Sequence, residues 1–276
     1  MDKILEIARK YKLYVIEDSC HAIGSKYKGE KVGTFGDAAF FSSQWSKPVT
    51  TGLGGWVVVN NPEISKKLKN IYPEFVEPSI KEISILKFQY FLHSVLLTSS
   101  LFWFAQNTYR FLSSLGIAVG SSSNEELESK MPADYKKKMS SWQAKILEKK
   151  LKDISQIIEH RKWVVTQYKK VVQKIGIEPV KFSGDYEPMY LRYPLVVKNK
   201  QKALESARKN RIEIGDWFVS SGHPNLYGWE KVGYQKGICP VAEEMCDHII
   251  NLPTHEKIGE KEINRIVEFI ACECKS

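Results

Sequence analysis

A short segment near the start of the chain places the tightest limits on what it can fold into. An apolar run at Leu13–Ile16 contains β-branched side chains and predicts a short buried strand, which the acid Asp18 closes. Apolar residues within Phe35–Ser43 and Trp56–Asn60 predict two more strands. A Ser-rich turn and a Gly-rich turn separate those two strands, and a single lysine, Lys47, lies between the turns. This order predicts an α/β sheet with an acid and a lysine at the ends of its strands.

Asp18 stands at the carboxyl end of its predicted strand, which is where open α/β sheets bind ligands. A carboxylate in that place can keep a pyridinium ring charged. Pyridoxal phosphate (PLP) needs such a carboxylate, together with a lysine for the Schiff base. Taken by itself, Asp18 fits a helix N-cap or a solvated strand end better. The hypothesis of a PLP site therefore depends on the lysine.

Lys47 is the residue that this hypothesis assigns to the Schiff base. The ordinary interpretation of a lysine is a solvated surface charge, but no other charged residue occurs between Asp37 and Glu63. A lysine held in a closed, partly apolar turn becomes a better nucleophile toward an aldehyde. Ser42 precedes it in the Ser-rich turn, where a hydroxyl and backbone N–H groups can bind a phosphate.

The three motifs together resemble those of the DegT/DnrJ/EryC1/StrS family of sugar aminotransferases, which have the type I PLP fold. The family signature E-D-x-x-[QH]-A-x-G corresponds to Glu17–Gly24, and G-D-x-x-x-F-S corresponds to Gly36–Ser42. The family lysine followed by T-T-G-x-G-G corresponds to Lys47 and Thr50–Gly55. The combination and its spacing are far more specific than a lone glycine motif.

The resemblance implies a role for five residues. Asp18 pairs with the pyridine nitrogen of PLP, and His21 packs near the ring and its phenolic oxygen. Ser42 binds the phosphate, and Lys47 forms the Schiff base. His223 lies where family members often carry a histidine near the substrate.

The resemblance also implies a fold and an activity. The fold is α/β: the C-terminal part of an aspartate aminotransferase-like, PLP-dependent transferase large domain with a mostly parallel sheet, plus a small α/β C-terminal domain. The activity is transfer of an amino group, with glutamate as the donor, to a nucleotide-linked keto-sugar in polysaccharide biosynthesis. The implied protein is a cytoplasmic homodimer. Retention of Lys47 argues against the dehydratase branch of the family, which has histidine there.

Two features depart from the family pattern. In the family, a long N-terminal portion with several strands and a phosphate-binding helix precedes the E-D signature, whereas only Met1–Tyr11 precede the first strand here. Leu53 replaces the usual glutamate of the Gly-rich motif. A type I sheet that lacks strands exposes a hydrophobic edge. Three alternatives stay open: a partner that supplies a complementing N-terminal half, a catalytically incomplete fragment or regulatory remnant, and a reshaped fold.

Composition limits the remaining classes of function. The chain has 276 residues, 43% hydrophobic and 26% charged, which is ordinary for a soluble globular protein of two domains. Its five cysteines form no C-x-x-C pair, and neither a disulfide framework nor metal-ligand spacing is evident. The net charge of +9 suits an anionic substrate. The lysines lack the aromatic interleaving of a single-strand binder, so solvated faces are favoured over nucleic-acid binding, and a DNA-binding regulator is the weakest alternative.

The middle of the chain contains an aromatic-rich stretch over residues 83–119. Gln89 and His93 interrupt its apolar run, which favours an amphipathic helical hairpin over peripheral membrane contact. Domain one is predicted over residues 1–120, with this hairpin as an insertion. Domain two is predicted over residues 121–276, with strands within Lys174–Val197, a helix at Gln201–Asn210 and a closing helix at Ile263–Ile270.

Overall fold

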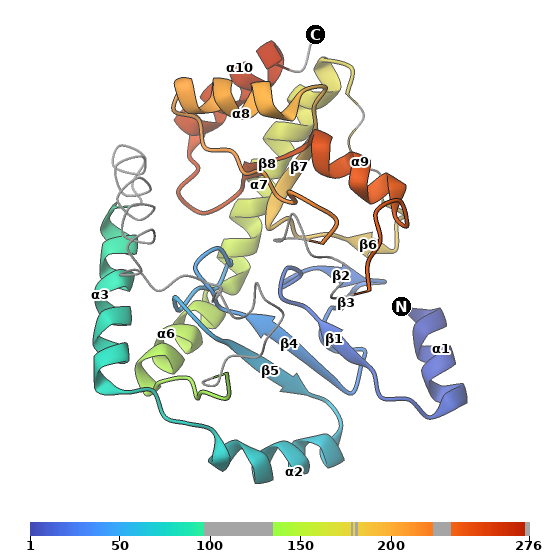
Figure 1. Cartoon of the computed structure of the whole chain (residues 1–276), viewed down its shortest axis with the longest axis vertical. Helices are drawn as coiled ribbons and strands as arrows, with labels where there is room; N and C mark the ends of the chain where they lie inside the picture. The colour runs from blue at the N-terminus through green and yellow to red at the C-terminus, as the bar shows by residue number, and fades with distance from the viewer. Residues whose placement is uncertain (97–134, 178, 180–181, 223–232, 274–276) are drawn as a thin grey trace. The chain divides into compact units, whose positions relative to one another are not determined.

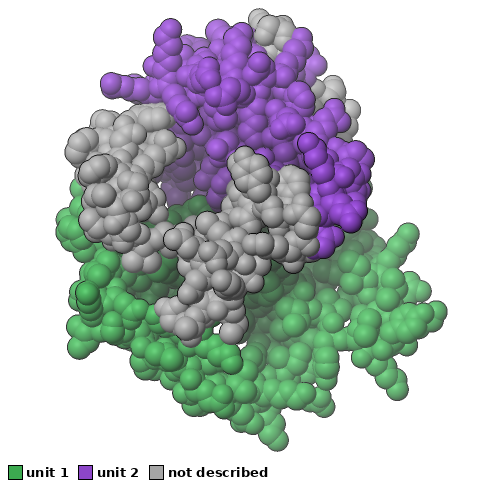
Figure 2. Space-filling model, viewed as in Figure 1, with its two compact units in different colours: residues 1–121, 133–159, 181–191 green, residues 122–132, 160–180, 192–276 purple. Residues whose placement is uncertain are grey.

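The computed structural model describes residues 1–96, 135–177, 179, 182–222 and 233–273, and it shows two compact units (Figures 1 and 2). Unit 1 comprises residues 1–121, 133–159 and 181–191, and unit 2 comprises residues 122–132, 160–180 and 192–276. Helix α7 (Ile154–Lys174) contributes to both, because unit 1 includes it up to Glu159. The boundary predicted at residue 120 lies outside the described residues.

A three-stranded sheet occupies the centre of unit 1, in the order β1-β4-β5 (Figure 1). Its strands are β1 (Ile16–Asp18), β4 (Ala38–Ser42) and β5 (Gly55–Val59). The pair β1–β4 is parallel and the pair β4–β5 is antiparallel, so this sheet is mixed. The register places Asp18 beside Phe40, and Phe40 beside Val57. The predicted α/β fold class is confirmed.

The burial predicted for the first strand is wrong. The strand begins at Ile16 rather than Leu13, and these two side chains are 62% and 59% exposed. Phe40 and Val57, which lie in register with Asp18, are also exposed. A run of apolar residues identifies side chains that suit burial, but it does not supply the layer that buries them. The described residues leave this apolar face of the sheet uncovered.

A second, antiparallel sheet and several helices complete the described part of unit 1. The sheet has the order β3-β2-β6, with strands β2 (Lys26–Tyr27), β3 (Glu30–Lys31) and β6 (Tyr186–Glu187). The helical elements are α1 (Asp2–Tyr11), α2 (Pro62–Ile71), η1 (Tyr72–Glu74), α3 (Ile80–Leu96) and α6 (Ser141–Lys152). Local sequence sets their starts. Asn61 accepts hydrogen bonds from two N–H groups at the start of α2, and Ser140 forms a capping box with Gln143 in α6.

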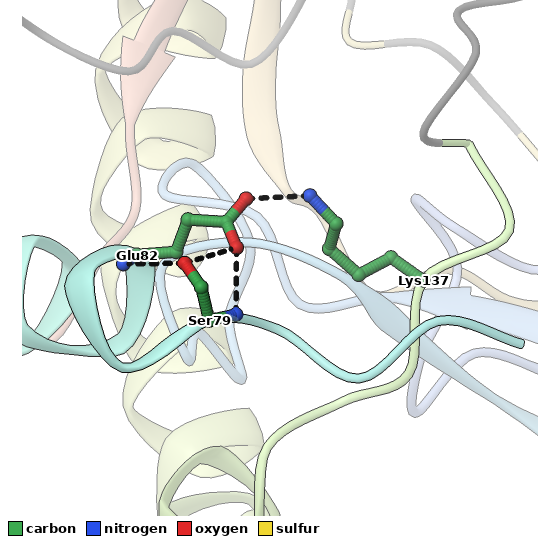
Figure 3. Close-up of polar contacts among 3 residues, drawn as sticks. All are labelled: Ser79, Glu82 and Lys137. Carbon is green, nitrogen blue, oxygen red and sulfur yellow. Dashed lines mark hydrogen bonds and ion pairs between the residues drawn. The ribbon is translucent and has the colours of Figure 1, made fainter.

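Helix α3 covers the first part of the stretch over residues 83–119, and residues 97–119 lie outside the described residues, so the helical hairpin stays a prediction. Its start is held by Glu82 (Figure 3). The Glu82 carboxylate accepts hydrogen bonds from the backbone N–H of Ser79 at 2.7 Å and from the Ser79 hydroxyl at 2.8 Å. Lys137 donates to the same carboxylate at 2.6 Å. These contacts lower the pKa of Glu82 to about 2, and the hydrogen bond from Lys137 makes the largest contribution.

The depressed pKa predicts an acid-sensitive contribution of Glu82 to stability. The stabilisation is complete above the ordinary value of 4.5 and is lost as the pH falls through about 2. Both partners are partly exposed, so we expect a contribution below about 1 kcal/mol. The stability difference between the wild type and Glu82→Gln, measured by urea unfolding, should shrink between pH 5 and pH 2. A difference that stays constant over this range would contradict the assignment. Glu77→Gln, which removes a more exposed ion pair to Lys138, is the matched control.

Unit 2 is a small α/β unit. Strands β7 (Arg192–Val196) and β8 (Ile249–Pro253) pair antiparallel, and the helices beside α7 are α8 (Lys200–Lys209), α9 (Pro240–His248) and α10 (Glu260–Glu273). Tyr168 of α7 is fully buried, and its hydroxyl donates to the Pro253 carbonyl at 2.8 Å. Ile250 and Leu252 of β8 are buried with it. Burial raises the pKa of Tyr168. None of the described helices has the length and apolar character needed to cross a membrane.

Candidate functional site

The two acids at the end of β1 have different surroundings. Glu17 is buried, and its carboxylate accepts three backbone hydrogen bonds, from the N–H groups of Gly33, Phe35 and Gly36, each at 2.8 Å. Asp18 is exposed, and its carboxylate accepts the backbone N–H of Cys20 at 3.1 Å and a hydrogen bond from the Cys20 thiol. Glu17 therefore fixes the turn that leads into β4, whereas Asp18 presents a carboxylate at the strand end.

Asp37, the acid of the G-D motif, also belongs to the scaffold. Its Oδ2 accepts the backbone N–H of Val15 at 2.8 Å, and its Oδ1 accepts the amide of Asn61 at 2.8 Å. These hydrogen bonds lower the pKa of Asp37, and the bond from Asn61 makes the largest contribution. Asp37 thus joins the start of β4 to the chain before β1 and to the cap of α2. Sequence reasoning had given this residue no role, because its partners are distant in the sequence.

Lys47 lies in a buried turn between β4 and β5. Its side chain is only 8% exposed, and its backbone N–H donates to the Gln44 carbonyl at 3.0 Å. Val49 and Thr51, which follow it, are completely buried. Gly52 has a φ of 92°, a conformation that side chains disfavour, and so it lets the chain turn toward β5. A buried turn with one lysine is the setting that the sequence predicted.

The Cys20 thiol is influenced by both Asp18 and Lys47. Burial and a hydrogen bond to Asp18 raise the pKa of the Cys20 thiol to about 11, and the positive charge of Lys47 opposes this rise. Both charges therefore act on one thiol. The predicted Schiff-base lysine and the predicted partner of the ring nitrogen are brought to the same part of unit 1.

The structure gives fewer contacts for the other predicted site residues. Ser42 ends β4 and is half-buried, and its Oγ accepts the backbone N–H of Gln44 at 3.4 Å. His21 is exposed in the turn that follows β1. His223 lies outside the described residues.

Helix α3 packs against the turn that holds Lys47. The sequence did not predict this contact. The His93 ring lies 5.0 Å from the Trp45 ring between centroids, and the Tyr90 ring lies 6.4 Å from it. A Cβ on Gly52 would come within 2.8 Å of Leu86 and 3.1 Å of Trp45. The helical spacing of the three α3 residues was the available signal. His93 was instead interpreted as an interruption of an apolar run.

An acid and a buried lysine near the ends of neighbouring strands of an α/β sheet define the class of site that suits PLP chemistry. The comparison with known families is more specific. A family model described as the DegT/DnrJ/EryC1/StrS aminotransferase family matches residues 1–271. The chain therefore belongs to the DegT/DnrJ/EryC1/StrS aminotransferase family, as its motifs predicted.

Individual relatives add detail. MJ1066 of Methanocaldococcus jannaschii is 30% identical over 98% of this chain and 62% of its own length. GDP-perosamine synthase of Escherichia coli O157:H7 is 54% identical over 61 residues, which are 22% of this chain and 17% of that enzyme. The PLP form of Spr1654 from Streptococcus pneumoniae, called a putative sugar aminotransferase, has the same fold, with a TM-score of 0.64 and 20% identity. That match covers 98% of this chain and 60% of Spr1654. The chain thus spans about 62% of the length of MJ1066.

Proposed function

We propose that the chain is a PLP-dependent aminotransferase that transfers an amino group to a nucleotide-linked keto-sugar in glycan biosynthesis. The buried Lys47 in the turn that follows β4, the strand that pairs in parallel with the strand of Asp18, is the observation that carries this proposal. Membership in the aminotransferase family supports it.

The residues of the site fit PLP. A carboxylate at a strand end, a buried lysine in the turn after the adjoining strand and a half-buried hydroxyl at the end of that strand supply the groups that the cofactor needs. Asp18 would hold a proton on the ring nitrogen, Ser42 would bind the phosphate, and His21 would lie near the ring. The cofactor, when bound, supplies an electron sink. Lys47 would bind it covalently, and its Nζ, once released, would take the proton from the donor's Cα and pass it to the bound cofactor.

The substrate class rests on two kinds of support. GDP-perosamine synthase, which matches this chain over 61 residues, carries a nucleotide sugar in its name. The net charge of +9 suits a diphosphate-linked substrate. The proposed donor, glutamate, and the substrate role of His223 rest on the family resemblance alone, as do the homodimer and the cytoplasmic location.

One experiment tests the proposal directly. The full chain is incubated with PLP, its absorbance spectrum is recorded, and the adduct is trapped with borohydride and mapped by peptide mass spectrometry. We expect a reducible band and an adduct at Lys47. Lys47→Ala should abolish both, whereas Lys149→Ala, which removes an exposed lysine of α6, should retain both. An adduct that maps only to exposed lysines would overturn the proposal.

A second candidate is a site that is complete only with a further segment. The uncovered face of the β1-β4-β5 sheet favours it, because Ile16, Phe40 and Val57 are exposed there. Relatives are also longer than the match. The same PLP experiment separates the two candidates when it is repeated after co-expression with the part of MJ1066 that this chain does not match. An adduct at Lys47 that forms only in the co-expressed sample would favour the complementing segment.

A further inference from the structure

We infer that Ser43, Thr51 and Gln143 form a hydrogen-bonded clamp that positions Lys47. These three residues are called the clamp below. The inference rests on the proposed function, because it assigns positioning residues to the lysine of that site.

Ser43 and Thr51 flank Lys47 on either side and close its turn. Both side chains are fully buried, and the Thr51 hydroxyl donates to the Ser43 hydroxyl oxygen at 2.8 Å. The Ser43 hydroxyl in turn donates to the Leu53 carbonyl at 3.2 Å. The backbone is joined in the same place, since the Thr51 N–H donates to the Ser43 carbonyl and the Ser43 N–H donates to the Gly54 carbonyl, each at 2.9 Å. Lys47 therefore sits at the middle of a loop whose two ends are tied together.

Gln143 anchors this loop to helix α6. Its Nε2 donates to the Leu53 carbonyl at 3.0 Å, and its Oε1 accepts the Ser140 N–H at 3.1 Å and the Ser140 hydroxyl at 2.9 Å. Both ends of the buried amide are thus engaged, which fixes its orientation. Helix α6, which lies far along the chain, thereby holds Leu53 in the loop that follows Lys47.

The clamp bears on Lys47 because a long, flexible side chain is directed by the backbone that carries it. The clamp bonds are buried, so a lost hydroxyl would leave a polar partner without water to replace it. The loop should then open rather than retain an unsatisfied group. An opened loop would expose the Lys47 amine and lose the geometry that selects it for PLP.

The test compares two labelling reactions of Lys47 in the full chain. The first is trace acetylation with acetic anhydride over a range of pH, and the second is PLP capture trapped with borohydride. In both, labelling of Lys47 is measured relative to the exposed Lys149 by peptide mass spectrometry. The variants are Thr51→Val, which removes the hydroxyl at constant shape, Gln143→Leu, and Thr51→Ser, which restores the hydroxyl. Thr166→Val removes an exposed hydroxyl of α7 that donates to a helix carbonyl, and it is the matched control.

We expect Thr51→Val and Gln143→Leu to raise relative acetylation of Lys47 and to lower its PLP capture, each by about tenfold, the size expected for one lost buried hydrogen bond. Thr51→Ser and Thr166→Val should stay within about twofold of the wild type, a difference too small to count as the loss of one hydrogen bond. Circular dichroism at the labelling temperature establishes that each variant is folded. If Thr51→Val does not fold, Gln143→Leu carries the same comparison.

Two results would overturn the clamp. One is a loss of thermal stability in Thr51→Val and Gln143→Leu with both labelling ratios unchanged, which would make the three residues purely structural. The other is failure of Thr51→Ser to restore the wild-type ratios. If the wild type captures no PLP at Lys47, the proposed function fails, whereas the acetylation ratios still decide whether the clamp restrains the lysine.

Discussion

Replacement of Glu17 by alanine should lower the free energy of unfolding on the order of 3–5 kcal/mol. The buried carboxylate accepts three backbone N–H groups, and alanine leaves all three without that acceptor. Each unsatisfied buried donor costs about 1–3 kcal/mol, and partial relaxation of the turn reduces the sum. Urea unfolding followed by circular dichroism measures the loss. Amide hydrogen exchange at Gly33, Phe35 and Gly36 localises it to this turn.

A graded series makes the Glu17 prediction sharper. Glu17→Gln keeps the oxygen that accepts from Phe35 and Gly36 but places an NH₂ group against the Gly33 N–H, so its loss should be intermediate. Asp18→Ala is the control, since that acid is exposed and accepts one backbone hydrogen bond, and it should cost no more than about 1 kcal/mol. If Glu17→Ala costs no more than Asp18→Ala, the scaffold role of Glu17 is wrong.

The second large effect is expected at Gly55. A methyl group there would lie 2.3 Å from the Phe41 carbonyl oxygen, a backbone atom held in the β4–β5 ladder. The strands must separate to admit it, so Gly55→Ala should destabilise the chain by about 3 kcal/mol. Gly55 pairs with Ser42, the proposed phosphate ligand, and PLP capture at Lys47 should fall as well. Thermal unfolding and the borohydride assay measure the two effects.

Gly184 provides the matched control for this glycine. A Cβ there would meet nothing within 4 Å, and its φ does not lie in the left-handed region. Gly184→Ala should therefore be neutral or stabilise the chain by up to about 1 kcal/mol, because alanine restricts the unfolded state. Equal changes in stability for Gly55→Ala and Gly184→Ala would contradict the prediction, because they would mean that the strands admit the methyl group at Gly55 without loss of stability.

The parts of the site that the sequence predicted are those with local signals. Lys47 was identified by its isolation from other charges between two turns, and the structure buries it in such a turn. The closing helix near Ile263–Ile270 was similarly evident from its periodicity, and it appears as α10. Both signals depend on residues that are close in the sequence.

The parts that were missed depend on contacts between distant residues. Glu17 and Gln143 contact backbone groups that lie far along the chain, so neither residue type nor spacing indicates what it binds. The strand at β1 was predicted, but its burial was not decided by its own sequence. Burial depends on a covering layer. A run of apolar residues indicates only that these side chains would suit such a layer.

The contrast between the neighbouring acids Glu17 and Asp18 has a consequence for how this chain can change over generations. A copy released from selection for chemistry could exchange Asp18 at little cost to folding, because that acid is exposed and accepts a single backbone bond. The same copy could not exchange Glu17 without unfolding the turn beside it. The motif would then decay unevenly, and half of it would persist in descendants that no longer catalyse anything. An intact Glu17 would therefore indicate only that the fold is kept, whereas Asp18 together with Lys47, the residues proposed for the chemistry, would indicate that the reaction is kept.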